Sequence, residues 1–211
     1  MSGGFDFNRS KAGSLGNFPF FGSERINLMA GRTIADGLVL AAGAPPDTVT
    51  SAFGRIVWAA NAATTAGVEW DISIPGDYAR SKPAEDDELQ FLLIAKSGAS
   101  GTVPAVMTPT LLYQRAGSAL SSAIALTSYK KAASLDLLEA ASFASSTTFT
   151  ANDAPTHPEA ILLKFRAGGL RPFDAARITI APAGSTNHAF SLFGMWMLPK
   201  CYGAIERFRK G

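Results

Sequence analysis

The chain has 211 residues, which suits one β domain with extra segments and allows a core to form without disulfides or metals. Charged residues make up 17% of the chain and the net charge is +2, which excludes a strongly basic or acidic protein. A single cysteine excludes an intramolecular disulfide, and no apolar run reaches the length of a membrane span. The first residues lack the apolar region of a secretory signal, so we expect the chain to be made in the cytoplasm.

Residues 1–33 are rich in Gly, Ser and Asn and show no helix or strand period, which predicts an N-terminal arm. The arm nevertheless holds five of the fourteen Phe residues, which a purely disordered linker would avoid. These aromatic anchors are Phe5, Phe7, Phe18, Phe20 and Phe21. We expect the last three to pack on the chain's own body and the first two to contact another subunit.

The two ends of the chain are basic, whereas the body between them is acidic. Residues 1–33 sum to +2, residues 199–211 to +3, and the remaining 11 basic and 14 acidic residues to −3. Basic ends can steer a terminus onto the acidic surface of a neighbouring copy, or they can simply keep the ends soluble. In the tail, the partner-binding candidates are Arg207, Phe208 and Arg209.

From residue 34 onward the chain reads as short β segments separated by turn signals. Residues 68–74 alternate strictly between apolar and polar side chains, which predicts a half-buried strand. Residues 89–95 form a near-continuous apolar run, which predicts a central strand buried on both faces. The predicted strands are 34–42, 53–61, 68–74, 89–95, 109–114, 123–127, 146–150, 160–166, 176–181 and 189–198.

One stretch, residues 130–143, has the Ala, Leu and Glu content of a short helix. About ten short strands with long, uneven connections predict an all-β fold. We therefore predict a two-sheet antiparallel sandwich of jelly-roll type with one inserted helix. The predicted division is an arm at 1–33, a sandwich domain at 34–198 and a basic tail at 199–211.

The sequence is poor in groups that carry chemistry. Its two histidines, His157 and His188, lie in predicted loops, and Cys201 has no motif around it. The acidic run 85–88 lacks the spacing of a calcium loop, and the glycine pair 168–169 predicts a turn rather than a phosphate loop. We predict no catalytic, metal or cofactor site and no enzyme activity. The acidic body argues against nucleic acid as the main partner.

Three phrases in the body carry a family resemblance. They are VEWDISIPGDY at 68–78, DELQFLL at 87–93 and LRPFDAARI at 170–178. In these phrases the chain resembles jelly-roll structural proteins of tailed bacteriophages, of the marine phage type. The resemblance implies a virion component that decorates the capsid or belongs to a fibre or tail. It also implies a homo-oligomer that binds the major capsid protein or tail components.

A carbohydrate-binding sandwich that acts in receptor recognition has the same architecture and remains the alternative. Sugar sites use exposed aromatic rings with polar groups beside them. Trp70 and Trp196 lie on apolar strand faces, so we expect them in the core. Tyr78 and Tyr129 lie beside turns or charges and are the predicted stacking platforms. An enzyme on the same scaffold would need a cluster of side chains that sequence alone does not display.

Overall fold

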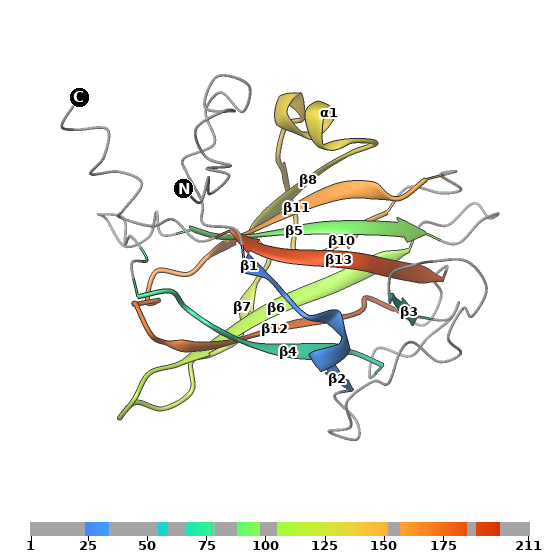
Figure 1. Ribbon diagram of the computed structural model, residues 1–211. Helices are drawn as coiled ribbons and strands as arrows, with labels where there is room; N and C mark the ends of the chain where they lie inside the picture. Colours follow the sequence, from blue (N-terminus) through green and yellow to red (C-terminus); the bar gives the residue numbers. More distant parts are fainter. Residues whose placement is uncertain are drawn as a thin grey trace, which may run out of the picture.

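The computed structural model describes residues 24–33, 55–58, 66–76, 78, 88–97, 105–151, 157–184 and 189–198. Within them, two antiparallel sheets pack face to face as a sandwich (Figure 1). The predicted fold class is confirmed. The predicted strand at 34–42 lies outside the described residues.

The first sheet is built around three long strands, β13, β5 and β11, in that order. Short strands extend it: β8 and β9 follow β11, and β1 and β3 pair with the other edge of β13. Its strands are β1 (Glu24–Arg25), β3 (Ile56–Trp58), β5 (Glu88–Ser97), β8 (Ser128–Ala132), β9 (Ala144–Ser145), β11 (Glu159–Arg166) and β13 (Phe190–Leu198).

The second sheet has the order β10-β6-β12-β4-β2, and β7 also pairs with β6. Its strands are β2 (Arg32–Thr33), β4 (Val68–Ser73), β6 (Val106–Gln114), β7 (Ile124–Ala125), β10 (Phe149–Thr150) and β12 (Ala175–Pro182). Two short helices complete the described elements, η1 (Leu28–Ala30) and α1 (Leu135–Ala140).

The strand pairing is that of a jelly roll. Early strands pair with late ones in nested fashion: β3 with β13, β4 with β12, β5 with β11 and β6 with β10. Alternate pairs fall into opposite sheets, as in a long antiparallel hairpin that has rolled up on itself. The segment that holds β7, β8, α1 and β9 is inserted between β6 and β10.

The core lies between the two sheets and follows from the alternation of the strands. Val68, Trp70 and Ile74 are buried, whereas Asp71 and Ser73 on the opposite face are exposed. In β5, the expectation of burial on both faces holds only in part. Four alternate side chains from Leu89 to Ala95 are fully buried in the core, whereas of the outward-facing ones between them Gln90 is buried and Leu92 and Ile94 are half-buried.

The predicted helix at 130–143 is too long. Residues 130–132 belong to β8, where they pair with β11, and α1 spans only Leu135–Ala140. Ser134 caps the helix, because its side-chain oxygen accepts a hydrogen bond from the Leu137 N–H at 3.3 Å. The reason for the error is tertiary: β11 offers a free edge, and pairing with that edge outweighs the helix propensity of Lys and Ala.

The segment 24–33 contributes one short strand to each sheet of the sandwich. β1 pairs with β13 of the first sheet, and β2 pairs with β4 of the second. Between them, Ile26 and Leu28 join the core, and Trp70 Nε1 donates a hydrogen bond to the Leu28 carbonyl at 3.1 Å. The boundary predicted at residue 33 thus falls directly after a strand of the second sheet.

Trp196 does not lie in the core, contrary to the expectation from sequence. A β-bulge between Leu192 and Gly194 inserts one residue into β13, which moves the following side chains to the opposite face. Met195 and Met197 therefore point into the core, and the half-buried Trp196 points outward over Gly194. The other predicted core tryptophan, Trp70, is 1% exposed, as expected.

Candidate functional site

The outer face of the first sheet is apolar across three strands. Leu162 of β11, Leu92 of β5 and Trp196 of β13 lie opposite one another in one cross-strand row. Ala160 and Ile94 form the next row. These side chains are buried or half-buried although they face away from the core. An apolar outer face of this kind needs a cover to keep it from water.

The short helix α1 covers one part of this face (Figure 1). Leu138 packs against Ala160 and Leu162 and is 4% exposed. The rest of the helix turns apolar side chains to solvent: Leu135 is 54% exposed and Leu137 is 60% exposed. Phe143, just after the helix, is 36% exposed. We call Leu135, Leu137 and Phe143 the α1 patch; the two leucines are two positions apart and so point to different sides of the helix.

Two lysines border the α1 patch. The ammonium groups of Lys164 and Lys130 lie 4.3 Å and 5.1 Å from the centre of the Phe143 ring, which is cation–π geometry. Lys164 also forms an ion pair with Glu88 at 3.1 Å. Burial lowers the pKa of Lys130, opposed by the nearby carboxylate of Glu139. The Phe143 ring is thus contacted by two ammonium groups, one of which is paired with Glu88.

A second exposed apolar feature lies at one end of the sandwich, in the connection from β11 to β12. Among the described residues, Phe173 is the most exposed large apolar side chain, at 81%. It has a φ of 65°, in the left-handed region that a bulky residue rarely adopts. Its ring lies over Gly76, where an added Cβ would come 2.4 Å from the ring.

A buried ion pair holds this connection in place. Asp174, 2% exposed, receives hydrogen bonds from Arg115 on both carboxylate oxygens, each at 3.1 Å. It also accepts from the Arg171 backbone N–H at 2.8 Å, and Arg115 donates to the Gly169 carbonyl at 2.7 Å. The Phe173 N–H in turn donates to the Ile74 carbonyl at 3.0 Å. These bonds fix the backbone that carries Phe173.

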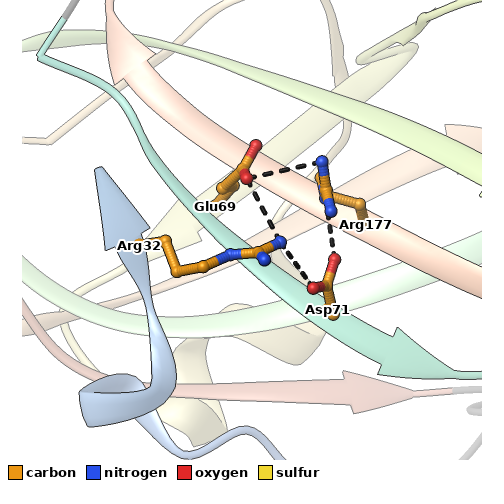
Figure 2. A network of polar contacts seen from close by, with 4 residues as sticks. All are labelled: Arg32, Glu69, Asp71 and Arg177. Atoms are coloured by element: carbon orange, nitrogen blue, oxygen red, sulfur yellow. Dashed lines mark hydrogen bonds and ion pairs between the residues drawn. The ribbon is translucent and has the colours of Figure 1, made fainter. Parts of the chain in front are cut away.

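A network of four charges crosses the outer face of the second sheet (Figure 2). Arg32 contacts Glu69 at 3.2 Å and Asp71 at 2.5 Å, and Arg177 contacts the same carboxylates at 3.4 Å and 2.7 Å. The hydrogen bond to Asp71 raises the pKa of Arg177. The two guanidinium groups each contact both carboxylates and balance their charge, so the network is suited to fastening β2 to β4 and β12.

Both predicted stacking platforms lack the exposure that a sugar site needs. Tyr78 is 1% exposed and belongs to the core, and its N–H donates to the Pro75 carbonyl at 3.1 Å. Tyr129 is half-buried, with its hydroxyl 3.2 Å from Thr150 Oγ1 and its ring packed against Phe149. The prediction for Tyr78 is wrong, and Tyr129 is only partly exposed.

The other sequence-predicted residues have different outcomes. His157 is exposed, and the glycine pair 168–169 forms the expected turn, closed by a hydrogen bond from Leu170 to Ala167. In the described ranges, no three His, Cys, Asp or Glu side chains gather as metal ligands. Outside those ranges lie Phe5, Phe7, Phe18, Phe20, Phe21, His188, Cys201, Arg207, Phe208, Arg209 and the acidic residues 85–87.

Sequence reasoning missed the two most exposed apolar features. Leu135 and Leu137 were part of a predicted helix, but helix periodicity does not tell which face a sheet will cover. Phe173 lies within the phrase LRPFDAARI at 170–178, where nothing marks it as exposed. No helix in the described part of the chain is long and apolar enough to cross a membrane.

No family model and no curated protein matches the sequence. Among solved structures, the chain is similar to the N-terminal CBM22-1–GH10 modules of Clostridium thermocellum endo-1,4-β-D-xylanase 10B, complexed with xylohexaose. The identity is 12% and the TM-score is 0.41, and the aligned part covers 86% of this chain and 28% of that chain. A likeness of this size carries no argument about what the present chain binds.

Proposed function

We propose that this protein is a non-enzymatic structural component that works by assembling with other protein chains, and that the assembly is a virion. The observation that carries the proposal is the α1 patch above an apolar outer sheet face. The virion itself comes from the resemblance to jelly-roll proteins of tailed bacteriophages. On that basis the protein decorates the capsid or forms part of a fibre or tail.

The α1 patch supports association because its side chains gain most from being covered. Leu135 and Leu137 are both more than half exposed on one short helix, with Phe143 directly after it. Covering what remains exposed of one such side chain is worth about 1 kcal/mol. Exposed apolar side chains gathered on one segment of the chain are candidates for an interaction surface.

The two ends of the chain are the proposed further contacts. β1 pairs with β13 at the edge of the first sheet, with Glu24 opposite Met197. We propose that Phe18, Phe20 and Phe21 pack on the chain's own body and that Phe5 and Phe7 reach a neighbour. The basic tail, with Arg207, Phe208 and Arg209, meets an acidic partner surface.

The test is the absolute mass in solution, measured by light scattering after size exclusion. Three proteins are compared: the full chain, the chain without residues 1–21, and the full chain with Leu135→Ser and Leu137→Ser. We expect a defined multimer for the full chain and a smaller species for the serine variant. Leu120→Ser is the matched control, because Leu120 is also exposed, at 56%, but lies in the connection between β6 and β7.

The outcome with the shortened chain assigns the role of the arm. A smaller species without residues 1–21 means that the arm holds copies together. An unchanged multimer means that the interface lies on the sandwich body. A monomeric full chain at all accessible concentrations contradicts self-assembly.

The carbohydrate-binding alternative retains one observation in its favour, the exposed ring of Phe173. It predicts binding in a glycan screen that Phe173→Ala abolishes. Binding that survives Phe173→Ala, or no binding at all, removes this alternative.

A further inference from the structure

We propose that residues 133–143, the segment that carries α1, form a hinged cover over the outer face of the first sheet. The cover opens as a local unit and uncovers Ala160 and Leu162 while the sandwich stays folded. In Figure 1, α1 stands on the outer side of β8 and β11, away from the core between the sheets. Opening takes place within one chain, so it does not depend on the proposed assembly.

One buried side chain fastens the cover. Between residues 133 and 145, all of which the structure describes, Leu138 is the only buried residue. It packs against Ala160 and Leu162 on the outer face of β11. A helix of six residues does not hold its shape in water by itself, so α1 depends on this contact.

The other contacts of the cover are ones that water can replace. The Lys130 ammonium group donates to the Glu139 carbonyl at 3.3 Å, which is a long hydrogen bond. Phe143, 36% exposed, receives cation–π contacts from Lys130 and Lys164, and such contacts are weak at exposed sites. Burial lowers the pKa of Lys130, so its charge gains hydration when the cover opens.

The sheet beneath the cover is held much more firmly. β11 pairs with β5 along its whole length and with β8 on its other side. The cover starts after Ala132, the last residue of β8, and ends before β9, which pairs with Ser128 and Tyr129 of β8. Both ends of the cover are therefore anchored on β8, so it can swing without breaking either sheet. Segments of this kind open at free energies below that of global unfolding.

The cover decides when this part of the apolar outer face is accessible. In the closed state Ala160 is 2% exposed and Leu162 is 1% exposed, although both point away from the core. Opening exposes them together with Leu138. The closed state thus protects an apolar strip from nonspecific association.

The test is native-state hydrogen exchange of the full chain at several urea concentrations. Leu138 and Ala141 report on the cover, because their N–H groups donate to the Ser134 and Leu138 carbonyls at 3.0 Å and 3.2 Å. After correction for intrinsic rates, we expect these amides to exchange roughly tenfold or more faster than the amides of the β11–β5 ladder. Their exchange should depend little on urea, because opening exposes little surface.

Three variants separate local opening from global unfolding. Leu138→Ala removes the fastening side chain and should speed exchange at Ala141 by a factor of roughly ten to thirty. Ile180→Val weakens the core of the second sheet, where Ile180 is fully buried. It should speed exchange of the ladder about fivefold and leave the cover unchanged. Leu137→Ala, at a 60% exposed position of the same helix, is the matched control and should change neither.

Cover amides that exchange at the rate and urea slope of the ladder, or that speed up in Ile180→Val, overturn the proposal. Unprotected amides at Leu138 and Ala141 overturn it as well, because no closed state then exists.

A thiol probe checks whether the sheet face itself is uncovered. Ala160→Cys and Ala167→Cys are compared in a chain with Cys201→Ser, because Ala167 is equally buried but belongs to the core. We expect the thiol at position 160 to be labelled roughly tenfold faster than the thiol at position 167. Equal labelling rates would mean that Ala160 is uncovered only by global unfolding, which also overturns the proposal.

Discussion

At the scale of single residues, two ion pairs of similar geometry contribute different amounts to the free energy of unfolding, because one carboxylate is buried and the other is exposed. Asp174 is 2% exposed and accepts from Arg115 and from a backbone N–H. The side chain of Asp71 is 55% exposed and shares two arginines with Glu69. Removing a partner from a buried pair leaves an uncompensated charge, whereas water replaces an exposed partner.

We therefore expect Asp174→Ala to lower the free energy of unfolding by about 2 kcal/mol, because the Arg171 N–H and the Arg115 guanidinium, which is 30% exposed, lose their shared buried acceptor. Asp71→Ala is the matched control and should cost about 1 kcal/mol or less. Urea denaturation of the three proteins measures both values. Equal losses for the two variants would contradict the assignment of Asp174 as the residue that holds the Phe173 loop.

At the scale of elements, the bulge in β13 decides which side chains face the core. It lets Phe190 and Leu192 point inward before it and Met195 and Met197 point inward after it. The same shift brings Trp196 onto Gly194, where an added Cβ would come 2.4 Å from the indole. The glycine thus makes room for the indole on the outer face.

Gly194→Ala should push the Trp196 indole from its position and cost about 2 kcal/mol of stability. Because Trp70 and Trp58 are buried, a change in tryptophan emission would report mainly on Trp196. Ser191→Ala, on the same strand before the bulge, is the control and should leave the emission unchanged. Unchanged emission in Gly194→Ala would show that the indole does not rest on this glycine.

At the scale of the whole molecule, the segment 24–33 ties the two sheets together. β1 extends the first sheet, β2 extends the second, and Ile26 and Leu28 fill the space between them. Arg32 adds the charge network that joins β2 to β4 and β12 (Figure 2). The segment is therefore part of the domain in structural terms.

A chain that starts at residue 34 should be about 4 kcal/mol less stable than one that starts at residue 22. The difference is the burial of two aliphatic side chains, each worth about 2 kcal/mol. Thermal and urea unfolding of the two shortened chains give the difference directly. If both unfold alike, the contacts of Ile26 and Leu28 contribute nothing to stability.

Much of the sandwich could be predicted because strand alternation is a local signal. Residues 68–74 and 176–181 fell on β4 and β12, and the core position of Trp70 followed from the alternation. The candidate surfaces could not be predicted in this way. The exposure of Leu137 and Phe173 depends on what covers each, and the burial of Tyr78 depends on where its turn leads.

The sequence by itself determined the class of fold, because apolar alternation and turn residues act between near neighbours in the chain. Only the tertiary structure decided the nested pairing of early with late strands, the strand β8 where a helix was expected, and the outward turn of Trp196 after the bulge. It also decided which apolar side chains stay in water. These outcomes arise from contacts between residues far apart in the chain, where edge pairing and packing outweigh local propensity.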